Sequence, residues 1–127
     1  MQVNEIKLRN VLKLNALFSV LNGIVLLAYE GLADLLNASA VALMIVGVGL
    51  LVFGIIVWLA AVSKRTSRKL VLSIILQDSI WVVTSLVVVT FGAWDLTDLS
   101  YWLISGVALV VLTFAWLQLR YLKRIAD

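Results

Sequence analysis

The sequence predicts an all-α fold, a bundle of four membrane-spanning helices arranged as two antiparallel hairpins. Of its 127 residues, 64% are hydrophobic and 13% are charged, whereas soluble domains carry about 45–50% apolar and about 25% charged residues. The mean hydropathy is +1.13, so a water-soluble form would expose large apolar patches. Four apolar stretches, each near the ~20 residues that cross the hydrocarbon, are separated by short polar turns. We therefore expect residues 1–127 to form a single transmembrane domain.

The first span is predicted at residues 11–30. No charge lies between Leu14 and Tyr29, and the long side chain of Lys13 can reach the interface from inside the span. In residues 1–13, charged and apolar residues alternate. This pattern fits either a helix lying in the membrane interface or a short lead-in to the span.

The second span is predicted at residues 39–62, within a stretch from 35 to 63 that has no charge. Asn37 or Ser39 could cap the start of its helix, since both residue types favour that position. The basic run at 64–69 closes the span.

The third span is predicted at residues 70–92 and has one charged residue, Asp78. A short acidic turn at 93–98 leads into the fourth span, 99–119, which ends at Arg120. The loops between spans are short, so consecutive spans should be antiparallel neighbours.

All 10 basic residues fall on one side of this predicted arrangement. They are Lys7, Arg9, Lys13, Lys64, Arg65, Arg68, Lys69, Arg120, Lys123 and Arg124. The opposite side holds the acidic residues Glu30, Asp34, Asp95 and Asp98. Because Lys and Arg accumulate in cytoplasmic loops, we expect both termini to be cytoplasmic.

Asp78 is the strongest candidate for a functional residue. At about 1.5 Å per residue, it lies roughly 13 Å beyond Lys69, inside the hydrocarbon and at a depth comparable to Ser19 and Asn22. An ionisable residue there is a functional-site hypothesis by default, because an unpaired charge costs a few kcal/mol or more. Residues four and seven apart share a helix face, which brings together a candidate polar site of Asp78, Gln77, Trp81, Ser85, Asn22, Ser19 and Asn15. The alternative is a neutral Asp78 hydrogen-bonded to Asn22 or Ser19 that only holds helices together.

Gly47 and Gly54 lie seven residues apart on the second span. Small residues on one face let helix backbones approach closely in lipid. We expect these two glycines to serve helix packing.

Several classes of function are disfavoured. The chain has no Cys and no His, which removes thiolate chemistry, imidazole metal ligands and His-ligated haem. No phosphate-binding glycine loop or metalloprotease motif is present. We therefore expect no cofactor, no metal site and no enzymatic activity. The basic loop 64–69 contains no aromatic residue, which argues against nucleic acid.

Three segments carry a resemblance to known sequences: 15–19 (Asn-Ala-Leu-Phe-Ser), 51–58 (Leu-Val-Phe-Gly-Ile-Ile-Val-Trp) and 78–82 (Asp-Ser-Ile-Trp-Val). They resemble a group of small bacterial four-span membrane proteins of unknown function, which have an acidic residue and a Trp in the third span. The resemblance covers most of the chain. It implies a bacterial cytoplasmic (inner) membrane location and no particular activity.

Two functional hypotheses follow. The first is a non-enzymatic accessory or assembly partner of a larger membrane complex, favoured by the short loops and the glycines of the second span. The second is a proton-coupled carrier or binder of small molecules that uses Asp78. In either case the lipid bilayer is the immediate partner, and a homo-oligomer is the alternative to a larger membrane complex.

Overall fold

The computed structural model describes residues 2–92 and 95–125 and consists almost entirely of helices, with no strand in those two ranges. The helices are α1 (Val3–Ala28), α2 (Leu32–Leu36), α3 (Ala40–Val62), α4 (Arg68–Phe91) and α5 (Asp98–Arg124). All but the short α2 are long and apolar enough to cross a membrane. The predicted all-α fold with four spanning helices is thereby confirmed, and the chain is a multi-pass transmembrane protein.

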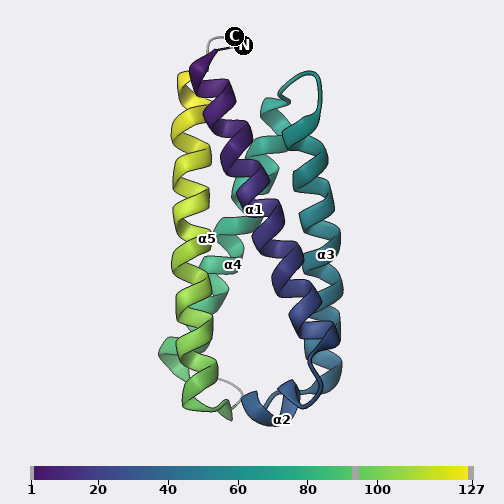
Figure 1. Ribbon diagram of the computed structural model, residues 1–127. Coiled ribbons are helices and arrows are strands. Elements are labelled where there is room, and N and C mark those ends of the chain that lie inside the picture. The colour runs from purple at the N-terminus through teal and green to yellow at the C-terminus, as the bar shows by residue number, and fades with distance from the viewer. Residues whose placement is uncertain (1, 93–94, 126–127) are drawn as a thin grey trace.

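The helices extend beyond the predicted spans at the end of the bundle where both termini lie (Figure 1). α1 begins at Val3 and is continuous, because Leu8, Val11 and Leu12 of its first turns are buried against the other helices. The segment from Val3 to residue 13 is thus part of the bundle and of α1, and is not a separate helix. α5 continues past residue 119 to Arg124. The turn predicted at 93–98 includes residues 93 and 94, which lie outside the described residues.

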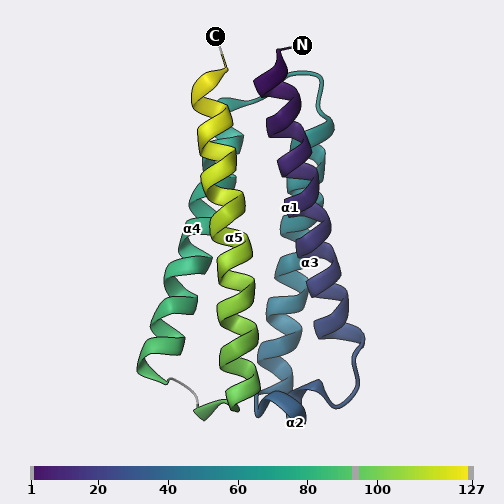
Figure 2. The same cartoon turned by 60° about the vertical axis from the view of Figure 1, so that its left-hand side comes forward.

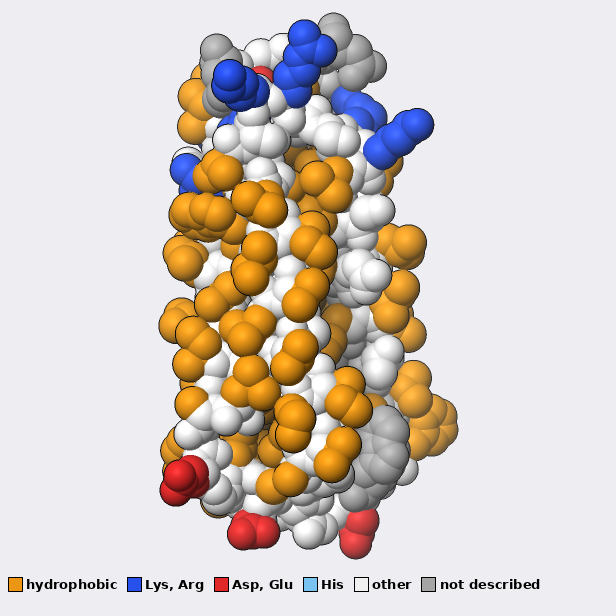
Figure 3. Space-filling view, turned by 90° about the vertical axis from the view of Figure 1, so that its right-hand side faces the viewer, with side chains coloured by type: hydrophobic (Ala, Val, Ile, Leu, Met, Phe, Trp, Pro, Cys, Tyr) orange, Lys and Arg blue, Asp and Glu red, His pale blue; other side chains and the backbone are white. Residues whose placement is uncertain are grey.

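The four long helices form two antiparallel hairpins joined along one seam. α1 packs along α3, α4 packs along α5, and α1 packs against α5, whereas α3 and α4 make few contacts. Figures 1 and 2 show both termini and the loop between α3 and α4 at one end, with α2 at the other. Basic side chains gather at the terminal end and acidic ones at the α2 end, separated by a broad apolar belt (Figure 3).

The main core lies in the half of the bundle that carries the termini. It contains apolar side chains from all four long helices: Leu8, Leu12, Ala16, Val57, Ala60, Ala61, Val71, Ile74, Ile75, Ala115 and Leu122. Most other large apolar side chains face outward, as expected for helices surrounded by lipid.

Gly47 and Gly54 lie where α3 approaches α1 closely. A Cβ atom on Gly54 would lie 2.6 Å from Val20 Cγ2 and 3.0 Å from the Ala16 carbonyl oxygen. A Cβ atom on Gly47 would lie 2.9 Å from Leu27 Cγ. Both glycines are buried, and their lack of a side chain allows the two backbones to pack at this distance.

The α2 end is held together by hydrogen bonds between the two turns. Thr97 N and Ser100 Oγ both donate to the Leu36 carbonyl oxygen, at 3.3 and 2.7 Å. Thr97 Oγ1 donates to the Leu35 carbonyl oxygen at 3.3 Å and also caps α5 by accepting from Ser100 N. These bonds satisfy carbonyl groups at the end of α2 that have no partner within that helix, and they fasten the first hairpin to the second.

Candidate functional site

Asp78 lies in a closed cluster of three polar side chains from three helices. Its Oδ2 accepts hydrogen bonds from Asn15 Nδ2 on α1 and Gln118 Nε2 on α5, both at 2.9 Å. Asn15 Nδ2 also donates to Gln118 Oε1 at 3.0 Å. The exposed fractions of Asn15, Asp78 and Gln118 are 1%, 3% and 0%, so the cluster is shielded from lipid and from the ends of the bundle.

The hydrogen bonds constrain where a proton on the Asp78 carboxyl can reside. Oδ2 already accepts two N–H donors, so a protonated Asp78 would carry its proton on Oδ1. Asn15 Oδ1 is buried and has no hydrogen-bond partner among the described residues. The cluster therefore retains an unused acceptor beside an ionisable group, and no basic side chain in residues 2–92 and 95–125 forms a salt bridge with Asp78.

Asn15, and not Ser19 or Asn22, is the residue of α1 that reaches Asp78. α1 and α4 begin at the same end of the bundle, at Val3 and Arg68. At about 1.5 Å per residue, Asn15 and Asp78 lie at similar depths from these starts. The sequence argument placed Asp78 at the depth of Ser19 and Asn22, which is one to two turns too far along α1.

The other polar residues predicted on α1 turn away from Asp78 or lie beyond it. Ser19 is buried one turn further along α1. Asn22 is half-buried, and its Nδ2 donates to the carbonyl oxygen of Phe18 in its own helix at 2.7 Å. The predicted hydrogen bond from Asp78 to Ser19 or Asn22 is therefore wrong for the described part of the chain, where Asp78 pairs with Asn15 and Gln118.

The residues predicted around Asp78 on α4 fall on different faces. Ser85 is buried, but its Oγ donates to the Trp81 carbonyl oxygen within α4 at 2.8 Å. Trp81 is half-buried, and Gln77 is exposed on the outer surface. None of these three side chains hydrogen-bonds to Asp78 in the described part of the chain.

Gln118 was missed by the sequence reasoning because the fourth span was expected to end at residue 119, next to the basic terminus. The sequence nevertheless contains a pattern that indicates a buried position for Gln118. Val111, Ala115, Gln118 and Leu122 follow the four-and-three spacing of a buried helical face, and all four are buried. A glutamine inside that apolar stripe indicates a polar contact in the core.

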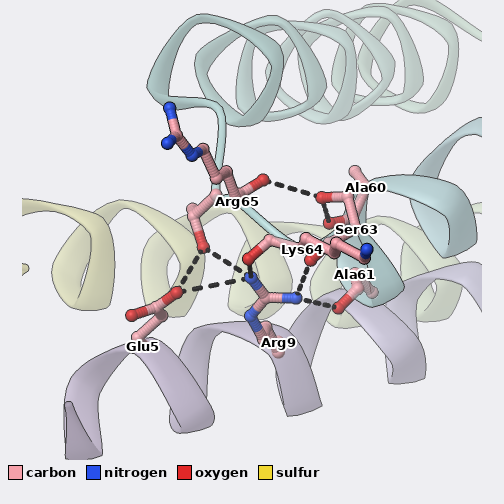
Figure 4. A network of polar contacts seen from close by, with 8 residues as sticks. Glu5, Arg9, Ala60, Ala61, Ser63, Lys64 and Arg65 are labelled. Carbon is pink, nitrogen blue, oxygen red and sulfur yellow. Dashed lines mark hydrogen bonds and ion pairs between the residues drawn. The ribbon is translucent and has the colours of Figure 1, made fainter. Parts of the chain in front are cut away.

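A second polar network, also missed, lies at the terminal end and is centred on Arg9 (Figure 4). The Arg9 guanidinium donates to the carbonyl oxygens of Ala61 (3.0 Å), Ser63 and Lys64 (3.4 Å) at the end of α3. It also pairs with Glu5 Oε1 at 3.3 Å. Arg9 is buried, with 9% of its surface exposed, and it caps the carboxyl end of a neighbouring helix.

Surface pockets lie at both ends of the bundle. One, of about 340 Å³, opens at the terminal end next to the loop between α3 and α4. The other, of about 240 Å³, lies at the opposite end beside Tyr101 and Trp102. Asp78 lines neither of them.

The described residues contain no group of three or more Asp, Glu, His or Cys side chains arranged to hold a metal ion. Comparison of the chain with known protein families, curated proteins and solved structures gives no match.

Proposed function

We propose that this chain is a small, non-enzymatic membrane protein that acts as an accessory or assembly subunit of a larger membrane complex. The observation that carries the proposal is a polar stripe on the outer surface of α4. Ser73, Gln77 and Thr84 are all exposed, and their spacing of four and seven residues places them on one face of the helix. This face lies within the apolar belt, where lipid would otherwise surround it.

Gln77 is the residue of this polar stripe whose side chain most needs a hydrogen-bond partner. Its amide can donate two hydrogen bonds and accept others, yet it makes none among the described residues. An unsatisfied polar group in hydrocarbon costs several kcal/mol, whereas a glutamine that hydrogen-bonds across a helix interface stabilises membrane helix association by about 1 kcal/mol. A partner helix that offers a polar side chain would satisfy Gln77.

The packing of the bundle leaves room for such a partner. α4 packs along α5 and makes few contacts with α3, so one flank of α4 is not covered by its own chain. A helix of another subunit seated there would complete the packing of α4 and bury the polar stripe.

Native mass spectrometry of the chain, extracted gently from its own membrane, tests this proposal. We expect a different protein at fixed stoichiometry with the unmodified chain and its loss with Gln77→Leu. Thr113→Leu is the matched control, because Thr113 is exposed on α5 and its hydroxyl is satisfied by the Leu109 carbonyl oxygen at 2.9 Å. Isolated monomers, self-assemblies alone, or equal retention of the partner by both variants would contradict the proposal.

We also propose that the chain resides in a bacterial cytoplasmic membrane with both termini in the cytoplasm. The separation of basic and acidic residues to opposite ends supports this orientation. The chain has no Cys, so single-cysteine variants can be labelled cleanly. In intact cells an impermeant maleimide should label Asp34→Cys and spare Lys123→Cys; the reverse pattern would invert the orientation.

A second candidate function is a proton-coupled carrier or binder of small molecules, favoured by the buried cluster of Asp78, Asn15 and Gln118. Asp78→Asn preserves the size of the side chain and removes its ionisation. The variant should lose pH-dependent transport or binding in reconstituted vesicles. If all such activity persists in Asp78→Asn, this candidate is excluded.

A further inference from the structure

The pocket at the terminal end is lined by cations on one side and by apolar side chains on the other. Lys64, Arg65 and Arg68 contribute the positive charges, and Leu122 and Ile125 of the α5 end form the apolar wall. The pocket, of about 340 Å³, lies where the membrane helices end, which is the level of the lipid headgroups.

The Arg9 network removes the negative partial charges that would otherwise weaken this site. The carboxyl end of a helix carries about half a negative charge on its unpaired carbonyl groups. Here the carbonyl oxygens of Ala61, Ser63 and Lys64 all accept from Arg9. The amino end of α4, which carries the opposite partial charge, begins at Arg68 beside the same pocket.

Glu5 also lines the pocket, but its charge is already compensated. Its Oε1 accepts from Arg9 Nη2 at 3.3 Å and from Thr66 Oγ1 at 3.0 Å. Arg68 Nη2 donates to the Ile125 carbonyl oxygen at 3.3 Å, which ties the basic wall to the apolar wall. Lys64 and Arg65 are exposed and supply positive charge at the mouth of the pocket.

We propose that this pocket is a binding site for the phosphate headgroup of an anionic lipid. Arginine and lysine bind phosphate through short, charge-assisted hydrogen bonds, and basic residues near the membrane surface attract anionic lipids. Ile125, backed by the buried Leu122, gives the pocket an apolar side that suits the first carbons of an acyl chain. Basic charge at a membrane end is common, but here it borders a shaped hollow with an apolar side, which a freely solvated loop does not offer.

The test lets two lipids compete for the purified chain, residues 1–127, and measures by native mass spectrometry which one is retained. The probes are phosphatidylglycerol and phosphatidylcholine with identical acyl chains. The unmodified chain should retain phosphatidylglycerol preferentially, and Lys64→Gln/Arg65→Gln should lower its retention by about tenfold or more. The matched control, Lys123→Gln/Arg124→Gln, removes the same charge from exposed positions at the same end, outside the pocket. Its retention should fall by no more than about threefold, since distant surface charges are screened. Equal losses in both variants would show diffuse attraction only and overturn the proposal.

Ile125→Glu provides a second variant that leaves every cation in place. A carboxylate at the rim of the pocket should repel the phosphate and reduce phosphatidylglycerol retention, while circular dichroism reports an unchanged helix content. Inorganic phosphate at millimolar concentration should not displace the lipid. Displacement by phosphate would show that the pocket recognises a free phosphate group as well as a lipid, and full retention by Ile125→Glu would show that the lipid binds elsewhere. Either result would overturn the proposal of a lipid headgroup site.

Discussion

Asn15 and Asp78, 63 residues apart in the sequence, are joined by a hydrogen bond of 2.9 Å from the amide of Asn15 to the carboxyl of Asp78. This bond connects the first hairpin to the second inside the apolar bundle. Gln118 donates to the same carboxyl oxygen, so the second hairpin already provides one donor by itself. Asn15 adds the contact that specifies how the two hairpins are aligned.

Replacing Asn15 should therefore loosen the association of the hairpins. We expect Asn15→Ala to lower the free energy of unfolding by about 1 kcal/mol, the usual size of a polar contact between membrane helices. Reversible unfolding in mixed micelles measures the change. Asn22→Ala is the control and should have a smaller effect, because within residues 2–92 and 95–125 Asn22 hydrogen-bonds only to its own helix. Equal effects would mean that the Asn15 contact contributes nothing specific.

Gly54 provides a steric test of the contact between α1 and α3. In Gly54→Ala the added Cβ atom would lie 2.6 Å from Val20 and 3.0 Å from the Ala16 carbonyl oxygen, and overpacking of this kind costs about 1–3 kcal/mol. A Cβ atom on Gly49 would meet nothing within 4 Å. Gly49→Ala should therefore be neutral or slightly stabilising, since alanine favours helix more than glycine does. Thermal unfolding in detergent distinguishes the two variants, and a loss in Gly49→Ala as large as in Gly54→Ala would refute the steric explanation.

At the terminal end, substitution of Arg9 should lower the stability of the fold more than substitution of any other residue. Removing its guanidinium leaves Glu5 without its ion pair and several carbonyl groups of the α3 end without a donor. We expect Arg9→Ala to destabilise the fold by roughly 3 kcal/mol, as for other buried charge partners, and to make the loop between α3 and α4 susceptible to proteases. Arg120→Ala is the control, because Arg120 is exposed and contacts only the Trp116 ring in the described structure. If limited proteolysis cuts the two variants at the same rate, the capping role of Arg9 is wrong.

At the opposite end, Thr97 combines a helix cap with a link between turns. Thr97→Val removes the cap of α5 and the hydrogen bond to the Leu35 carbonyl oxygen, and should cost about 1 kcal/mol or more. Ser39→Ala removes a cap alone, the bond from Ala42 N at 3.3 Å. Hydrogen exchange of the α2 amides should rise in Thr97→Val and stay unchanged in Ser39→Ala. Unchanged exchange in both would show that the link does not hold the turn.

The sequence predicts the fold well because a membrane span is defined by about 20 apolar residues together. Changing a single residue hardly alters the length of such a stretch. The four apolar stretches, with their basic and acidic ends, define the spanning helices before any contact is known. Helix ends are harder to predict. The sequence predicts that the first span begins at residue 11, whereas α1 begins at Val3. Counting depth from residue 11 on the first span and from residue 70 on the third pairs Asp78 with Ser19, and not with Asn15.

Partner choice within the site could not be predicted from periodicity alone. Helical spacing shows which residues share a face, but not how far one helix is shifted along its neighbour. For α4, the face of Asp78 and the face of Gln77 are both polar, and their spacing does not reveal which one is buried. The structure places Asp78 in the core and Gln77 outside, a distinction that depends on where α1 and α5 pack.

The division of the polar cluster between hairpins bears on how the chain is made. α1 and α3 are synthesised before α4 and α5, so at that stage the Asn15 amide lacks both of the partners that it has in the finished bundle. Asp78 and Gln118 arrive later and can pair with each other before they meet Asn15. A half-synthesised chain would thus expose a polar side chain that the completed protein buries, since only 1% of Asn15 is exposed in the finished bundle.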